Sequence, residues 1–236
     1  MIILLPPSEG KAPGGRGIWQ PREGSFGEAL ERPRRAVLKD LATASDAHLK
    51  VRGDLAVTAR QINRQLGRGP SLPGYQRYTG VVFQGLDIAS LSADDKRRAL
   101  RTVVVVSGLL GLVRLSDPVP EYRAPIDART ERLGKLSQFW HGELAESLAA
   151  LARRHVIVDL LPQAHRAAVT PVGEWQRVDL VSSRGVGGHG AKFAKGRFAR
   201  WLIQHPDEDL TTWREDRKST RLNSSHVALS RMPSSA

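Results

Sequence analysis

The chain has 236 residues, of which 40% are hydrophobic and 25% charged, a balance typical of folded soluble proteins with one large domain or two small ones. It contains no cysteine, which excludes disulfides, thiolate zinc sites and cysteine-held iron–sulfur clusters. The opening stretch has only four apolar residues after Met1, and no run reaches the roughly eighteen apolar residues of a membrane span. We therefore expect no signal peptide and no membrane contact, and we predict a cytoplasmic protein.

The formal net charge is +12 and the sequence pI is near 10.8. Such an excess of basic side chains favours a polyanionic partner, because cations that neutralise phosphates release condensed counterions. The alternative is a genome that simply encodes arginine often. The positions of the basic residues must decide between these explanations.

The first predicted element is the apolar run Ile2–Leu5, which is typical of a buried strand. It leads directly into Pro-Pro-Ser-Glu-Gly-Lys, so Ser8, Glu9 and Lys11 stand at the carboxyl end of a strand, where ligand sites often lie. The spacing of a Walker phosphate loop is absent. A plain turn is the more common meaning of such residues.

A helix is predicted over Asp54–Leu66, where apolar residues recur on one face. The flanking stretches 14–27 and 67–74 are rich in Gly, Pro and Arg and are expected to be mobile loops. In the stretch 75–87 that follows, three aromatic residues alternate with Arg77 and with glycines that include Gly80. Aromatic rings can stack on bases while a cation holds phosphate, although such aromatics more often belong to the core of a half-buried strand.

A second buried strand is predicted at Val103–Val106, and Ser107 and a Gly-x-x-Gly turn follow it. The amides of such a turn can approach an anion closely, and nearby arginines would complete a phosphate site. The turn glycines are Gly108 and Gly111, and the arginines are Arg114 and Arg123. On its own, Gly-x-x-Gly is equally typical of a tight turn.

Leucines and Trp140 recur every three or four residues over 133–151, which predicts one helix of about five turns. Further apolar runs at Val156–Leu161 and Val178–Val181 predict two more strands. Because strands alternate with helices, we predict an α/β fold, of mixed α+β character, with a single domain around one central sheet.

The last native motif is a helix near 185–202 that is rich in glycine and cations. A helical wheel gives it an apolar face for docking on the core, formed by Ala194, Phe198, Trp201 and Leu202. Lys192, Lys195 and Arg197 lie on the rest of the surface with Gly196 among them, which would present cations and a bare backbone patch outward. The alternative is an ordinary solvated basic face.

Residues 216–236 are predicted not to be native protein. Two blocks, 216–226 and 230–236, can be back-translated in one frame into a common sequencing-library adaptor, and the residues between them fall where a sample index would lie. The segment is Ser-rich with little to bury, so we expect it to be disordered. It carries a net charge of +3, which leaves +9 of the +12 for residues 1–215. The true C-terminus is expected to be missing.

Catalytic and metal-binding patterns are poorly represented. The seven histidines are never closer than ten residues apart, and no G-x-S-x-G sequence occurs. We therefore predict no metal and no cofactor, and expect a binding protein more than an enzyme.

The motifs taken together, in this order, resemble the peroxide stress protein YaaA family. The matching stretches are Leu-Leu-Pro-Pro-Ser-Glu-Gly-Lys, Tyr-Thr-Gly-Val-Val-Phe-Gln-Gly-Leu, Ser-Gly-Leu-Leu-Gly-Leu-Val-Arg with Asp-Pro-Val-Pro-Glu-Tyr-Arg, Gln-Phe-Trp, and Ala-Lys-Phe-Ala-Lys-Gly-Arg. The resemblance covers about residues 1–210 and departs from the family at Leu110, where an aromatic residue is common.

The resemblance implies an unusual topology with a basic cleft, binding to duplex or branched DNA through a helix-hairpin-helix element, and a role in oxidative stress and DNA repair. The region Val37–Leu66 is the first candidate for the hairpin element and the Gly108–Gly111 turn is the second. Lowering of free iron is another role attached to the family. Because this chain has no cysteine and no histidine cluster, protection of DNA is the simpler hypothesis.

The leading hypothesis is therefore a stress protein that binds DNA through phosphate contacts with little sequence specificity. Its predicted DNA contacts are Lys11, Arg77, Arg114, Arg123, Lys192, Lys195 and Arg197, with phosphate-facing backbone at Gly80, Gly108, Gly111 and Gly196. The rival is an enzyme acting on a nucleobase or nucleotide, with Ser8, Glu9, Lys11 and Ser107 around the substrate. The sequence leads to no prediction of oligomeric state.

Overall fold

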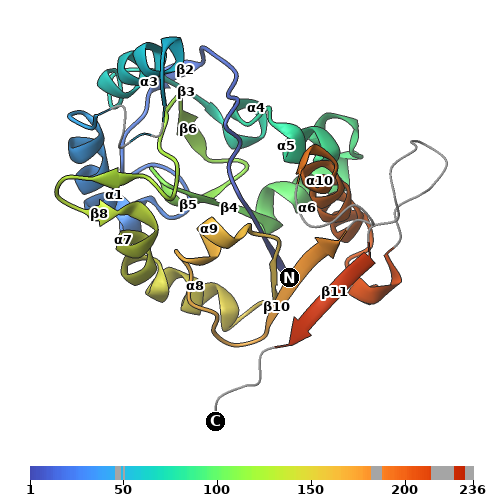
Figure 1. Ribbon diagram of the computed structural model, residues 1–236. Coiled ribbons are helices and arrows are strands. Elements are labelled where there is room, and N and C mark those ends of the chain that lie inside the picture. The colour runs from blue at the N-terminus through green and yellow to red at the C-terminus, as the bar shows by residue number, and fades with distance from the viewer. Residues whose placement is uncertain (46–48, 50, 182–187, 214–225, 232–236) are drawn as a thin grey trace.

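Within the residues that the structure describes, a central sheet of six strands has the order β11-β10-β9-β1-β4-β5 (Figure 1). The computed structural model describes residues 1–45, 49, 51–181, 188–213 and 226–231. The strands β10, β9, β1 and β4 run parallel, whereas β5 and β11 are antiparallel to their neighbours β4 and β10. Their bounds are β1 (Ile2–Leu5), β4 (Val103–Ser107), β5 (Gly111–Arg114), β9 (Ile157–Asp159), β10 (Trp175–Val181) and β11 (His226–Arg231).

The four apolar runs predicted as strands are all confirmed, as β1, β4, β9 and β10. Every residue of β1, β4 and β9 is buried, as expected for parallel strands covered on both faces. Leu4 lies between Val104 of β4 and Asp159 of β9 in the register. Because the four strands are parallel, they end along one side of the sheet, here called the carboxyl edge. The mixed α/β fold class is confirmed.

Helices cover both faces of this sheet. In Figure 1, α5, α6 and α10 gather on one side, with α10 packed against α5 and α6, and α7 and α8 lie on the opposite side. The helices are α1 (Gly27–Leu41), α3 (Asp54–Arg64), α4 (Gly74–Arg77), α5 (Val81–Leu86), α6 (Ala93–Thr102), α7 (Leu136–Glu143), α8 (Ala145–Ala152), α9 (Gln163–Arg166) and α10 (Gly188–Gln204), with 3-10 turns at Ile88–Ser90 and Leu210–Thr212. None of the described helices is both long and apolar enough to span a membrane.

The single helix predicted over 133–151 is instead two helices, α7 and α8, which meet at Leu144. The apolar stripe survives the break, because Leu136, Trp140, Leu144 and Leu148 are all buried. A stripe with helical spacing therefore located the buried face correctly but did not reveal the interruption.

Two smaller sheets lie outside the central one. The strands β2 (Arg16–Ile18), β3 (Pro70–Pro73) and β6 (Pro118–Pro120) form one, and β7 (Arg129–Thr130) and β8 (Gly134–Lys135) form the other. The stretches predicted as mobile loops thus contain β2 and β3.

The aromatic stretch 75–87 is not a strand, which corrects the interpretation of its aromatics as strand residues. It contributes α4 and α5. Val82, Phe83 and Leu86 are buried on one side of α5, at a spacing of three and four residues that the short sequence window concealed.

The tail is partly ordered, which corrects the prediction of a disordered segment for His226–Arg231. These residues form β11, paired with β10 from Gln176↔Arg231 to Val181↔His226. The physical reason is that β10 offers a free row of backbone N–H and C=O groups that any extended segment can satisfy. The rest of 216–236 lies outside the described residues, and its adaptor origin remains a prediction.

Candidate functional site

Three buried hydroxyl groups form a chain at the carboxyl edge. Ser107, the last residue of β4, lies 2.7 Å from the Tyr122 hydroxyl, which lies 3.1 Å from the Tyr78 hydroxyl. Burial raises the pKa of Tyr122 to about 12 and raises that of Tyr78 well above its ordinary value. Both phenols are therefore protonated at neutral pH and serve as hydrogen-bonding groups.

Lys11 lies beside this chain, on the turn that follows β1. Its Nζ donates a hydrogen bond to the Ser8 carbonyl at 2.9 Å and lies 4.1 Å from the centre of the Tyr122 ring. Burial, reinforced by the positive charge of Arg123, lowers the pKa of Lys11 from 10.5 to about 7. A large fraction of this amine is consequently neutral at physiological pH.

Arg123 and Glu9 border Lys11 on its solvent side. The Arg123 Nη2 lies 3.7 Å from a Glu9 carboxylate oxygen, and the Glu9 side chain is 84% exposed. The Arg123 Nε is buried without a hydrogen-bond partner among the described residues. Asn63 of α3 fixes the backbone of Arg123 through hydrogen bonds of 2.9 and 2.8 Å to its N–H and C=O. The backbone is held firmly while the guanidinium is held weakly.

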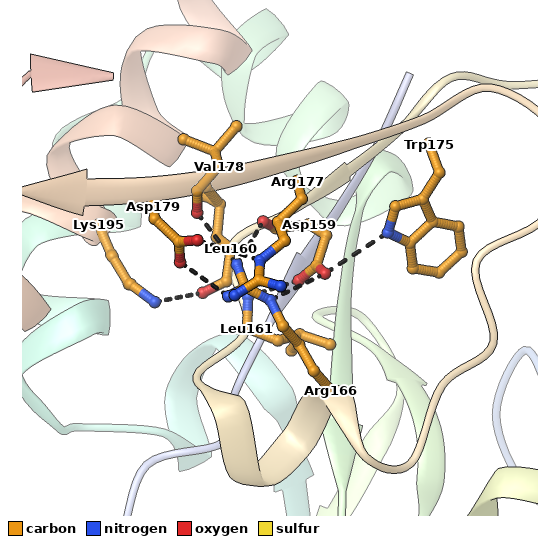
Figure 2. A network of polar contacts seen from close by, with 9 residues as sticks. All are labelled: Asp159, Leu160, Leu161, Arg166, Trp175, Arg177, Val178, Asp179 and Lys195. Carbon is orange, nitrogen blue, oxygen red and sulfur yellow. Dashed lines mark hydrogen bonds and ion pairs between the residues drawn. The ribbon is translucent and has the colours of Figure 1, made fainter. Parts of the chain in front are cut away.

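A second charged cluster joins β9, β10 and α9 (Figure 2). The Arg166 guanidinium contacts Asp159 at 3.1 Å and Asp179 at 2.7 Å, and Asp179 also accepts from Arg177 at 3.0 Å. Trp175 donates its indole N–H to Asp159 at 3.4 Å. Burial alone would raise the pKa of Asp179, but the hydrogen bond from Arg166 lowers it. The cluster ties the ends of two adjacent strands together.

Lys195 of α10 reaches the same edge. Its Nζ donates to the Leu160 carbonyl at 2.8 Å, one residue beyond β9 (Figure 2). Burial, together with the charge of Arg166, lowers the pKa of Lys195 to about 8. This lysine therefore anchors α10 to the sheet.

His165 of α9 is a buried histidine whose two ring nitrogens have no hydrogen-bond partner among the described residues. Burial lowers its pKa from 6.5 to about 4; the nearby Asp127 opposes that shift and Lys195 reinforces it. His165 is therefore neutral at physiological pH. No group of three His, Asp or Glu side chains in the described part of the chain could hold a metal ion.

Comparison with known proteins decides the family. The model of a family described as peroxide stress protein YaaA matches residues 1–217. The chain belongs to this family. A UPF0246 protein of Streptomyces coelicolor is 37% identical over 221 residues, covering 86% of this chain and 83% of that protein. A UPF0246 protein of Corynebacterium glutamicum is 31% identical over 224 residues, covering 89% and 88%. Membership of the YaaA family supports a role in peroxide stress.

Arg77 does not reach the surface in this YaaA-family chain, which corrects its prediction as a DNA contact. The residue is 0% exposed. Its guanidinium donates to the carbonyls of Val119, Gly14 and Pro70 at 3.0, 2.8 and 3.2 Å, and to that of Ala12. Arg77 is therefore a buried cross-link between the β2-β3-β6 sheet and the segment after β1.

Arg114 is placed away from the carboxyl edge, which corrects its grouping with Lys11. It ends the antiparallel strand β5 and pairs with Val104, near the start of β4. Its guanidinium lies 5.7 Å from the centre of the Phe26 ring, and burial lowers its pKa. Because the chain reverses direction after Ser107, Arg114 lies near the start of β4, at the end of the sheet opposite the carboxyl edge.

The Gly-x-x-Gly turn is packed inside the protein, which corrects the prediction of a phosphate-binding turn. The amides of Leu109 and Leu110 both donate to the Ser107 hydroxyl at 3.2 Å, so this oxygen stabilises the turn. A Cβ on Gly108 would lie 2.3 Å from the Ala124 carbonyl, and Gly111 has a φ of +66°. These glycines are needed for close packing and for a left-handed backbone.

Gly196 is also buried, so it does not form a bare outward patch as predicted. A Cβ at this position would lie 2.0 Å from the Val82 carbonyl of α5. A Cβ on Gly85 of α5 would likewise lie 2.3 Å from the Phe193 carbonyl of α10. Paired glycines let the two helices cross in backbone contact. Gly80, immediately before α5, is half-exposed and packs on Ser8, whose hydroxyl donates to the Gly10 carbonyl.

The cations of α10 are divided between interior and surface. The predicted apolar face is confirmed, with Ala194, Phe198 and Leu202 buried. Lys192 and Arg197 are exposed, whereas Lys195 is hydrogen-bonded at the carboxyl edge. Of the predicted contacts, the structure thus brings Lys11, Arg123 and Lys195 to the carboxyl edge and leaves Lys192 and Arg197 free to contact a partner.

Sequence reasoning missed His165, Tyr122 and Asp159. An acidic residue inside the apolar run 156–161 was a signal that could have pointed to Asp159. The second candidate for the hairpin element, Gly108–Gly111, is the turn between strands β4 and β5, so it does not link two helices. The first candidate region contains the end of α1 and α3, and residues 46–48 and 50 between them lie outside the described residues.

Proposed function

We propose that this YaaA-family chain binds DNA, duplex or branched, in the response to peroxide stress. Phosphate contacts dominate the interaction, so binding depends little on sequence. The observation that carries the proposal is the arrangement of α10. Its apolar face is fixed on the core while Lys192 and Arg197 point to solvent, on a helix that Lys195 anchors to the carboxyl edge.

The charge of the molecule supports the proposal. Residues 1–215 carry a net charge of +9, and several cations that are buried have their donors occupied by carbonyl groups. The exposed cations are those that can release counterions from a nucleic acid. Within the part of the chain that the structure describes, the Arg123 guanidinium has a single 3.7 Å contact, with the exposed Glu9 carboxylate, so it is the cation beside Lys11 that could contact a phosphate.

A mobility-shift titration of the full chain tests this function. A short duplex, a four-way junction and a single strand are each titrated at about 50 and 200 mM salt, where two phosphate contacts alone weaken duplex binding about tenfold. The expected result is binding of unrelated duplex sequences with similar affinity and a clear loss at the higher salt. The absence of a complex with any DNA form at the lower salt would refute it.

An enzyme acting on a nucleobase or nucleotide is the second candidate function. The observation that favours it is Lys11, an amine with a pKa near 7 placed against Tyr122 at a strand end. Calorimetric titration with nucleoside monophosphates tests it. Saturable binding that Lys11→Met abolishes, in a protein that does not bind DNA, would favour the enzyme.

A further inference from the structure

The environment of Lys11 differs from that expected of a phosphate contact. A phosphate-binding lysine works as a cation, whereas burial and the charge of Arg123 favour the neutral amine of Lys11. A neutral amine at neutral pH is the reactive form of lysine, which attacks carbonyl carbon to form Schiff bases. The site therefore favours nucleophilic chemistry over simple charge neutralisation.

The geometry leaves this amine available for reaction. Among the described residues its Nζ forms one hydrogen bond, to the Ser8 carbonyl, and no ion pair with a carboxylate within 4 Å. A hydrogen bond to a carbonyl leaves the nitrogen lone pair free once the amine is neutral. The Tyr122 ring lies 4.1 Å from Nζ, and Glu9, two residues before Lys11, is exposed.

We propose that Lys11 forms a Schiff base with the aldehyde of an abasic deoxyribose in DNA. The inference rests on the proposed DNA binding and names the substrate class for the same edge of the sheet. The Nζ attacks the aldehyde carbon to form a C–N bond and a carbinolamine. Loss of the former carbonyl oxygen as water, with protons exchanged through solvent, gives the imine without any oxidant or reductant.

Arg123 and Glu9 explain why a DNA aldehyde fits better than a free one. An abasic sugar lies between two phosphates, and the weakly held Arg123 guanidinium is the cation whose charge lowers the Lys11 pKa most. The Glu9 carboxylate, now 3.7 Å from Arg123, would be displaced by a phosphate. Arg123 is therefore a positioning residue for the flanking phosphate.

Lys195 is the competing amine at the carboxyl edge. Its Nζ donates a hydrogen bond to the Leu160 carbonyl, and its side chain lies beside the Arg166 cluster (Figure 2). The α-amino group of Met1 is a second competitor, but it lies at the other end of β1. Lys11 is the preferred nucleophile because Glu9 and Gly10, on the same turn, are exposed.

Borohydride trapping with the full chain tests the proposal. The protein is mixed with a duplex that contains one abasic site, the imine is reduced to a stable amine, and the attached peptide is identified by mass spectrometry. The expected result is a covalent protein–DNA adduct at Lys11. It is lost in both Lys11→Met and Lys11→Arg and retained in the matched variant Lys39→Met, which removes an exposed lysine of α1 that has no part in the proposed DNA site. Adduct yield is expected to rise about tenfold from pH 6 to 8 and then level off, as a pKa near 7 requires.

The outcomes separate this proposal from DNA binding itself. If the wild type shifts an intact duplex but gives no adduct with the abasic duplex, the Schiff base is refuted and DNA binding stands. An adduct that maps to Lys195 or Met1, or that persists in Lys11→Met, also refutes it. If free deoxyribose is trapped with the same yield as abasic DNA, the proposed role of Arg123 in positioning a flanking phosphate is refuted. Thermal melting of each Lys11 variant verifies that it is folded.

Discussion

At the scale of single residues, cations in this chain have two different tasks. Arg77 and Lys195 stabilise the interior by donating to carbonyl groups, and Lys192 and Arg197 face solvent. A guanidinium can satisfy several carbonyls at once, which makes arginine suited to joining irregular segments. Counting basic residues therefore overestimates the surface that is offered to DNA.

Replacing Arg77 is expected to destabilise the fold. Arg77→Ala removes a buried guanidinium that donates to four carbonyl groups, of which that of Val119 is buried, and the free energy of unfolding should fall by about 3–5 kcal/mol. Urea denaturation measures this value. The control is Arg35→Ala on α1, an exposed arginine paired with Glu31, which should cost about 1 kcal/mol or less. Equal effects of the two variants would contradict a buried cross-link.

His165 is expected to make stability depend on pH. Its pKa is about 4 when folded, below the ordinary 6.5, so the unfolded chain binds more protons between these values. The free energy of unfolding should therefore fall as pH is lowered from 6.5 to 4. Urea denaturation at several pH values should show a shallower fall in His165→Gln. Parallel curves for the two proteins would show that His165 is not buried in its neutral form.

At the scale of elements, the contact between α5 and α10 positions the exposed cations. Gly85 and Gly196 bring the two backbones together, and Arg200 adds hydrogen bonds of 3.2 Å to Leu86 and 2.7 Å to the Asp87 carbonyl. The orientation of Lys192 and Arg197 depends on this crossing.

Gly196→Ala is expected to separate the two helices. The added Cβ would lie 2.0 Å from the Val82 carbonyl, so the free energy of unfolding should fall by about 1–3 kcal/mol despite the better helix propensity of alanine. Gly142→Ala on α7 is the matched control, because nothing lies within 4 Å of its Cβ, and it should stabilise by up to about 1 kcal/mol. Stabilisation by both substitutions would contradict the close crossing.

Removal of residues 216–236 tests the interpretation of the tail. If β11 only occupies the free edge of β10, the chain ending at 215 should melt within experimental error of the full chain. Circular dichroism during heating measures the midpoint. A decrease of several degrees would show that β11 belongs to the fold.

At the scale of the whole molecule, the strands could be predicted and the site only partly. The runs Ile2–Leu5 and Val103–Val106 predict buried parallel strands, because a strand covered on both faces consists of uninterrupted apolar residues. The burial of Arg77 and the low pKa of Lys11 depend on partners such as Val119 and Tyr122 that the chain brings from far away in sequence. No local pattern records those contacts.

The central claim is electrostatic binding of DNA through α10 at the carboxyl edge. Its most direct test is the salt dependence of the duplex Kd for Lys192→Gln/Arg197→Gln, compared with Arg153→Gln/Arg154→Gln. The control pair is exposed and lies between α8 and β9, at the opposite edge of the sheet. Loss of two phosphate contacts should lower the slope of log K against log salt by about 1.8 in the α10 variant, with no comparable change in the control. An unchanged slope in a folded α10 variant, or an equal decrease in the control, would contradict the account.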